Sequence, residues 1–262
     1  MCHAEGVKQS EKDGRRAVPN PVAAAPPPRT PRERAREQTI ADIVRLGRRH
    51  LAVHGAAALS LRAVARDLGV VSSAVYRYVE SRDELLTLLL VDAFSELGDE
   101  VDAAVAAVPA HDFSARFKAL GRAVRDWALR EPASYALLFG SPVPGYEAPA
   151  ERTTGPGTRV IVTLVGILDD ASRAGRLAAG KPGAAGIPAH LRADLAAIRS
   201  AFSLAMPEEL VARGVLVWSA LFGAVSFEVF NQYGPDTFSA PAELFNHHLS
   251  VLAEVAGLPV SP

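Results

Sequence analysis

Apolar residues recur at intervals of three and four along most of this chain, and no segment alternates apolar and polar residues as a half-buried strand does. The pattern begins after Thr30, which forms a Thr-x-x-Glu capping signature with Glu33, while Pro31 suits a first helical turn. The spacing predicts a helix over residues 31 to about 54, ended by Gly55. We therefore expect an all-α fold.

The region after this helix fits two short helices and the start of a long one. Ser60 can cap the first short helix, and Gly69 offers the positive φ angle that a tight turn between helices needs. A second short helix is expected over about residues 72 to 79, and Ser81 then caps a long helix. Residues 60 to 79 thus have the outline of a helix-turn-helix motif, which places its second helix in a DNA major groove.

Helical periodicity continues beyond residue 98, interrupted by two stretches rich in proline and glycine. Residues 140 to 157 are predicted to form an irregular loop, and residues 180 to 188 a second break. The helices expected in this part contain residues 113–127, 160–171, 191–202, 207–233 and 241–257.

Charge is distributed unevenly along the chain. Residues 29 to 82 contain 11 Lys and Arg against 5 Asp and Glu, whereas residues 83 to 262 contain 13 against 21. A basic end attracts polyanions and gains affinity by displacing condensed counterions, and an acidic remainder keeps the rest of the surface off nucleic acid. The asymmetry favours DNA as a partner, although uneven solvated charge alone would also produce it.

Residues 1 to 30 combine scattered charges with prolines and almost no large apolar groups, so we expect a disordered tail. No apolar segment follows its basic residues, which argues against a secretory signal. The apolar run at residues 160 to 168 is far shorter than the roughly 20 residues of a membrane span. These features predict a cytoplasmic protein without a membrane segment.

The chain offers few groups for metal binding or catalysis. Its single cysteine, Cys2, excludes an internal disulfide and a multi-cysteine metal site. His247 and His248 are adjacent and point about 100° apart on a helix, and Asp169 and Asp170 are interpreted as solvated. No nucleophile, base and orienting group occur at a recognisable spacing. We expect no metal, no cofactor and no enzymatic activity.

The second short helix carries polar residues on one side. Ser72, Ser73, Tyr76, Arg77 and Tyr78 can donate hydrogen bonds while the opposite side packs inward. Short hydroxyls at the start of a helix suit close approach to phosphates and base edges, and arginine binds phosphate or, bidentately, guanine. A solvated helix face is the alternative interpretation.

Two strings make this region specific: LRAVARDLGV at residues 61–70 and SAVYRYVESRDELL at residues 73–86. They resemble the DNA-binding domain of the TetR family of bacterial regulators, and the resemblance covers about residues 36 to 98. One departure is Val71, where the family commonly places a serine that caps the recognition helix. We expect Ser72 to cap instead, which would shift the start of that helix by one residue.

The family resemblance implies that Tyr76, Tyr78 and Arg82 hold the DNA backbone, and that the start of the preceding helix adds phosphate contacts. Together with the polar face of the second helix, this gives one set of candidate DNA-binding residues. The set is Ser60, Arg62, Ser72, Ser73, Tyr76, Arg77, Tyr78 and Arg82.

The C-terminal part, through YALLFGSPVPGY at residues 135–146 and WSALFG at residues 218–223, resembles the WHG-type effector domain of the same family. Phe222 stands where the subgroup has histidine, so no role of that histidine transfers. The resemblance implies that the last two helices pair with their counterparts in a homodimer. Aromatic residues on these helices are candidates for a ligand pocket, or for ordinary core. They are Trp127, Phe139, Trp218 and Phe222.

We therefore predict a sequence-specific, DNA-binding transcriptional regulator that represses transcription from a double-stranded DNA operator. An unknown small-molecule effector is expected to relieve this repression. The expected parts are the tail at 1–30, a DNA-binding domain with its connecting helix at 31–98, and a ligand-sensing and dimerisation domain at 99–262. A helical protein-interaction scaffold without DNA binding and an all-α enzyme are the alternatives. The sequence leaves open the operator, the regulated genes, the effector and the sign of regulation.

Overall fold

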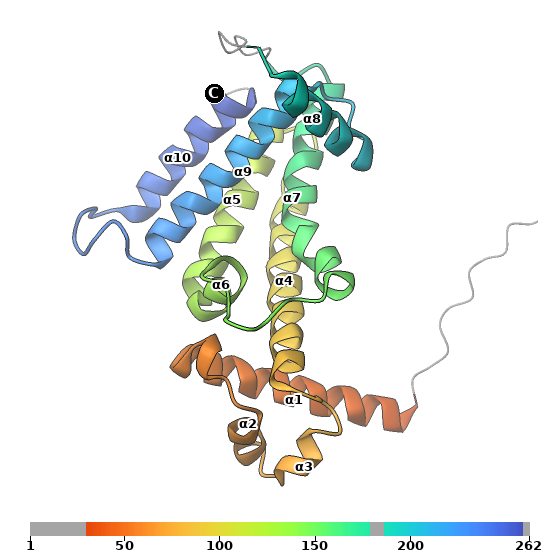
Figure 1. The fold of residues 1–262 in the computed structure, drawn as a ribbon. Helices are drawn as coiled ribbons and strands as arrows, with labels where there is room; N and C mark the ends of the chain where they lie inside the picture. Colours follow the sequence, from red (N-terminus) through yellow and green to blue (C-terminus); the bar gives the residue numbers. More distant parts are fainter. Residues whose placement is uncertain (1–29, 179–185, 259–262) are drawn as a thin grey trace, which may run out of the picture.

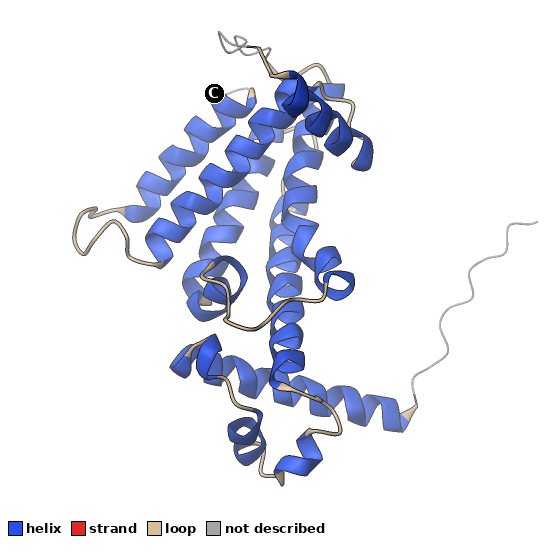
Figure 2. Ribbon diagram, in the orientation of Figure 1, coloured by secondary structure: helices blue, strands red, loops and turns tan. Residues whose placement is uncertain are grey.

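The computed structural model describes residues 30–178 and 186–258, and every regular element in these residues is a helix (Figures 1 and 2). The all-α prediction is confirmed. The tail up to residue 29 and most of the break at 180–188 lie outside the described residues. The elements are α1 (Pro31–His54), a 3-10 turn η1 (Ala56–Ala58), α2 (Leu61–Asp67), α3 (Ser72–Val75), α4 (Arg82–Ala106), α5 (Phe113–Arg130), α6 (Pro132–Phe139), α7 (Ala150–Arg173), α8 (Ala189–Ala201), α9 (Glu208–Val229) and α10 (Pro241–Ala256).

Helix α1 begins and ends as its sequence predicts. The Thr30 hydroxyl accepts the Glu33 backbone N–H, and the Glu33 carboxylate accepts the Thr30 N–H, so both halves of the capping box are present. Gly55 ends the helix with φ of 74° while its N–H donates to the Leu51 carbonyl. A side chain at that φ would be strained, which explains a glycine there.

Two apolar clusters divide the molecule. The head, which we define as α1, α2, α3 and the first turns of α4, packs around residues such as Ile43, Val64 and Leu86. The body, which comprises the rest of α4 and α5 to α10, packs around residues such as Phe117 and Trp127. Helix α4 contributes to both cores and links them, with the head at one end of the molecule (Figure 1).

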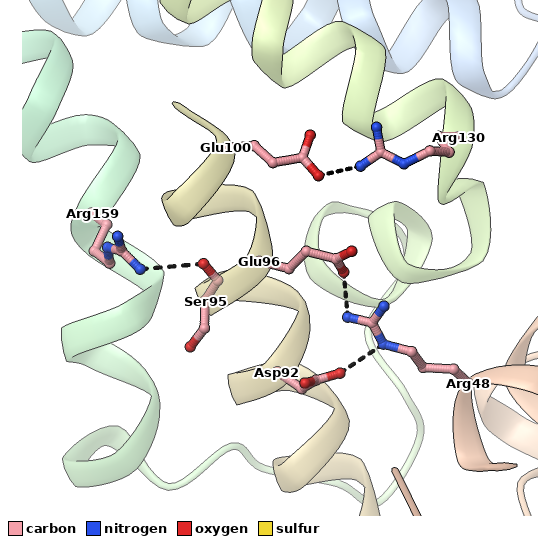
Figure 3. A network of polar contacts seen from close by, with 7 residues as sticks. All are labelled: Arg48, Asp92, Ser95, Glu96, Glu100, Arg130 and Arg159. Atoms are coloured by element: carbon pink, nitrogen blue, oxygen red, sulfur yellow. Dashed lines mark hydrogen bonds and ion pairs between the residues drawn. The ribbon is translucent and has the colours of Figure 1, made fainter. Parts of the chain in front are cut away.

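Arginines from three helices bind α4, with Arg159 on one side of it and Arg48 and Arg130 on the other (Figure 3). Arg48 of α1 bridges Asp92, at 2.6 Å, and Glu96. From the body, Arg130 of α5 pairs with Glu100, and Arg159 of α7 donates to the Ser95 carbonyl at 3.2 Å. Burial opposes the charge on Arg48, but its two carboxylate partners outweigh burial and raise the pKa of its guanidinium. Ionic contacts thus fix α4 to its neighbours on both the head and the body.

The predicted irregular loop at 140–157 is too long, because α7 already begins at Ala150. Pro149 precedes the first turn, where a missing N–H costs nothing, and the helix continues through Pro156. Figure 1 shows the first turns of α7 offset from the rest of the helix, as expected at an internal proline. The irregular segment is therefore shorter, from residue 140 to 149.

That loop lies against the head rather than in solvent. Val143 and Tyr146 pack on the head core, and the Tyr146 hydroxyl lies 2.9 Å from the buried Thr87 hydroxyl. Just beyond, Arg152 pairs with Glu84 at 2.6 Å. The loop therefore connects the body directly to the first turns of α4.

Helix α9 has the length and composition of a membrane-spanning segment, alone among the helices in the part of the chain that the structure describes. The expectation of no membrane segment rested on a shorter apolar run, at residues 160 to 168. About a third of the segment is buried, and the helix packs against α5, α7, α8 and α10. Its apolar composition therefore serves the body core on one side and leaves an apolar surface on the other.

Asp169 corrects the expectation of a solvated acidic pair. Its carboxylate is buried and accepts the backbone N–H groups of Ala205 and Met206, at 2.6 and 2.9 Å, and the Arg173 guanidinium at 2.7 Å. Burial alone would raise the pKa of this carboxyl, but these donors outweigh burial and lower it. Asp170 is exposed and pairs with Arg116. Asp169 thus anchors the segment between α8 and α9 to α7.

We expect Asp169→Ala to lower the free energy of unfolding by about 1–3 kcal/mol at pH 7, because it leaves a buried N–H without an acceptor. Because the folded pKa is depressed, the ionised carboxylate contributes fully above its unfolded pKa of about 3.9 and loses its effect as pH falls through the folded value. Urea unfolding of both chains should therefore show a difference that narrows below about pH 4. Asp170→Ala is the matched control, expected within about 0.5 kcal/mol of the parent. Equal losses for both variants would contradict this role of Asp169.

Candidate nucleic-acid interface

Helices α2 and α3 meet as a helix-turn-helix at the end of the molecule farthest from α10 (Figure 1). The Ser60 hydroxyl accepts the Ala63 N–H at 3.5 Å and caps α2. Gly69 has φ of 77°, which allows the chain to reverse into α3. Val64 and Val75 both belong to the head core and are almost completely buried. One side of the motif is thereby fixed inward, and the other side is left to solvent.

The start and end of α3 differ from the prediction. Val71, rather than Ser72, is the N-cap residue, and it makes no side-chain cap hydrogen bond. The helix therefore starts at Ser72 without the expected shift, because the extended backbone of Val71 alone is enough to begin the first turn. It ends at Val75, after which tighter turns carry the chain to Val79.

Polar side chains cover the outer side of this motif. Ser73, Tyr76 and Arg77 are exposed, with Tyr76 at 44%. Arg62 is exposed at the start of α2, and Ser72 is half-buried. Within residues 30–178 and 186–258, neither the Arg62 nor the Arg77 guanidinium has a carboxylate partner, unlike Arg45, Arg48 and Arg159. These two positive charges are available to an anion.

Tyr78 lies deeper than the other candidates. Its ring packs against the head core, and the Arg36 guanidinium lies 5.4 Å above the ring centroid. Arg36 also donates to the Arg77 carbonyl at 3.3 Å. Arg36 is not among the predicted site residues, since no motif relates residue 36 to residue 78. These two contacts of Arg36 hold the end of the helix-turn-helix, at Arg77 and Tyr78, against α1.

Arg82 is engaged within the protein. Its guanidinium donates to the Ala56 and Ala57 carbonyls, at 3.0 and 3.2 Å, and lies 3.6 Å from Asp83. Arg82 thereby ties the start of α4 to η1, although a third of its side chain stays exposed. The eight candidates thus fall into three groups. Four are exposed, three are half-buried, and Arg82 braces the head. The exposed residues are Arg62, Ser73, Tyr76 and Arg77, and the half-buried residues are Ser60, Ser72 and Tyr78.

Arg82→Ala should therefore destabilise the head, by about 1–2 kcal/mol, since hydrogen bonds from charged groups contribute about 1.5–3 kcal/mol and partial exposure weakens them. Arg62→Ala should leave the free energy of unfolding within about 0.5 kcal/mol of the parent while weakening DNA binding. Thermal unfolding and DNA titration of both chains test this division. The reverse order of stability losses would refute the bracing role.

Three of the four predicted ligand-pocket aromatics come together. The Phe139 and Phe222 rings lie 4.7 Å apart between centroids, and Trp218 approaches Phe222 edge-on at 6.3 Å. Trp127 is fully buried, its indole N–H has no hydrogen-bond partner, and it makes no ring contact with the other three in the described part of the chain. Trp127 therefore belongs to the core, and the other three form an aromatic cluster on α6 and α9.

Comparisons with known proteins agree with this architecture. Residues 43–89 match a family model described as bacterial regulatory proteins of the tetR family, and residues 117–252 match one described as a tetracyclin repressor-like C-terminal domain. The chain is 50% identical over 226 residues to HTH-type transcriptional regulator Rv1816 of Mycobacterium tuberculosis, covering 86% of this chain and 94% of that protein. HTH-type transcriptional regulator Mb1846 of Mycobacterium bovis matches equally well.

Solved structures give the same result. The crystal structure of the regulatory protein SCO4313 superposes with a TM-score of 0.69 at 34% identity, covering 86% of this chain and all of that chain. The regulator PfmR of Thermus thermophilus, at 15% identity and a TM-score of 0.53 over 83% of this chain and 99% of its own, shares the fold. With a helix-turn-helix at one end and a matching C-terminal domain, this chain belongs to the TetR family and is a DNA-binding transcriptional regulator.

Proposed function

We propose that the outer side of α2 and α3 is the DNA-reading surface, with α3 in the major groove. The observation that carries this proposal is the pair of unpaired guanidiniums, Arg62 and Arg77, on a surface otherwise rich in hydroxyls. Arg77 and the serines of α3 face base edges and phosphates, and Tyr76 adds a hydroxyl from the same side. Ser60, Arg62, Tyr78 and Arg82 contribute to the backbone contacts or to the geometry that supports them.

The active form is a homodimer through α9 and α10. Leu216, Val215 and Phe227 of α9 are 55%, 44% and 46% exposed, and Val251 of α10 is 42% exposed. A groove of about 490 Å³ runs between the two helices and is lined largely by apolar residues. Large exposed apolar patches are uncommon on monomers. A second copy of the same surface would bury them and place two heads on successive major grooves of a near-palindromic operator.

An effector acts on the body and changes the placement of the heads. The cluster of Phe139, Trp218 and Phe222 suits an apolar or aromatic molecule, because ring faces and edges pack favourably against such ligands. The 140–149 loop, which follows Phe139 directly, connects this cluster to the head through Tyr146. A ligand that binds one arrangement of the heads better than the other shifts the equilibrium between the two arrangements and relieves repression.

The regulator works in the cytoplasm.

A salt titration tests DNA reading directly. The purified protein is first used to select bound genomic fragments, and the selected operator is then titrated at several salt concentrations. Several phosphate contacts per head predict that the logarithm of the binding constant falls steeply with the logarithm of the salt concentration, with a slope of about −0.9 for each phosphate neutralised. Negligible DNA affinity at low salt would support a protein-interaction scaffold instead. Unchanged operator binding after Tyr76→Ala and Arg77→Ala would reject this assignment of the surface.

A further inference from the structure

Val71 is an apolar side chain on the polar outer side of the helix-turn-helix. It is 71% exposed, it lies outside the head core, and its neighbour Val70 is 39% exposed. Among the large apolar side chains of the described residues, only Val53 is more exposed, at 74%. A single exposed valine is ordinary on a protein surface, so its position must carry the argument.

The position is the N-cap of α3, where valine is a poor choice. The first N–H groups of a helix lack intrahelical partners, and serine, threonine, aspartate or asparagine at the N-cap supplies an acceptor that valine does not have. Val71 makes no side-chain cap bond, and no packing contact with the head core compensates. The structure of the head therefore gives no reason for an apolar residue at this point.

The chemistry of the major groove supplies a reason. The N-terminal residues of a recognition helix are those that contact base edges. The C5-methyl of thymine is the apolar group on those edges, and apolar side chains recognise it by contact. Ser72 and Ser73 follow directly with hydroxyls that can bond polar base atoms or phosphates. We propose that Val71 contacts the methyl group of one thymine in each operator half-site and so fixes that base pair.

This inference rests on the proposed DNA-reading surface, and it is tested on the operator selected by the purified protein. Each thymine in turn is replaced by deoxyuridine, which removes the methyl and keeps every hydrogen-bonding group. At one thymine per half-site, the parent protein should bind about fourfold more weakly, because burying one such carbon is worth about 0.8 kcal/mol and about 1.4 kcal/mol is tenfold. Replacement in both half-sites should weaken binding about sixteenfold if the two contacts are independent.

Variants at position 71 assign the effect. Val71→Ala should bind the thymine and uracil operators with nearly equal affinity at that position while still discriminating at the others. Val71→Ser should also abolish the discrimination, yet its hydroxyl can cap α3 and raise the melting temperature, so that reduced stability cannot explain reduced selectivity. Val162→Ala on α7 is the matched control, since it removes the same atoms from a 46% exposed valine of the body and should keep the parental discrimination.

Two results would overturn the inference while leaving the proposed DNA surface intact. One is selective operator binding by a parent protein that tolerates uracil at every thymine. The other is a uracil penalty of the same size in the parent and in Val71→Ala. Failure of the proposed surface would look different, because operator binding would then be absent, or it would be unchanged by Tyr76→Ala and Arg77→Ala.

Discussion

A Leu216→Glu chain is expected to be monomeric and to bind the selected operator at least about a hundredfold more weakly than the parent. Leu216 is 55% exposed on α9, in the surface proposed to meet the partner, and a carboxylate there would be buried against apolar groups. Two linked heads bind their half-sites with an avidity gain of about 10² to 10⁴, which a monomer does not have. Analytical ultracentrifugation measures the first result, and operator titration measures the second.

Leu191→Glu on α8 is the matched control, because Leu191 is 45% exposed on a helix outside the proposed interface. It should remain dimeric and bind the operator as the parent does. A monomeric Leu191→Glu together with a dimeric Leu216→Glu would move the interface to α8. A Leu216→Glu monomer that binds the operator with parental affinity would reject the dimer as the DNA-binding form.

Arg77→Ala should also weaken operator binding strongly, by about 2–6 kcal/mol for the dimer, since a bidentate arginine–guanine contact is worth about 1–3 kcal/mol in each half-site. The fold should survive, because Arg36 bonds the Arg77 backbone carbonyl, which alanine keeps. Competition titration with operators altered at each base pair should show relaxed selectivity at one position per half-site.

Arg62→Ala should differ from Arg77→Ala in the kind of binding that it weakens. Removing a phosphate ligand at this position should weaken binding to all DNA sequences about equally and reduce the salt slope by about one for each head. If Arg77→Ala instead weakened all sequences equally, Arg77 would be a phosphate ligand and a residue of α3 would read the bases. If neither variant changed affinity or slope, the free guanidiniums of this surface would have no part in DNA binding.

The sequence was informative where structure depends on neighbours in the chain. The cap at Thr30 and the turn at Gly69 depend on residues close together in the chain, and the structure has both as predicted. Local signals failed at Pro156, which lies inside α7 although its proline and glycine neighbours predicted an irregular loop. The predicted start of α3 was also wrong. The serine that the family commonly places at position 71 suggested that Ser72 would be the N-cap here, but the N-cap is Val71.

Interactions between distant residues left no such signal. The bracing role of Arg82 depends on η1 lying beside it, and Arg36 has its role only because α1 folds over Tyr78. The burial of Asp169 depends on donors more than thirty residues along the chain, at positions 205 and 206. Trp127 and Phe139 are both aromatic, and the sequence does not distinguish them. Only the packing of the folded chain shows that Trp127 belongs to the body core and that Phe139 belongs to the aromatic cluster on α6 and α9. The candidate DNA surface was thus predictable as a group, and the individual tasks of its members were not.

Helix α4 runs unbroken for 25 residues from the head core into the body core. At a rise of about 1.5 Å per residue it is a rigid rod of roughly 37 Å, and ionic contacts tie its sides to both parts. A tilt of only about 10° at its body end would swing the far end by about 6 Å, close to two base-pair steps of B-DNA at about 3.4 Å each. The two heads of a dimer must be spaced to match the helical repeat of the duplex. A slight rearrangement of the body around a small molecule would therefore be enlarged along α4 and would move the heads out of register with the two half-sites.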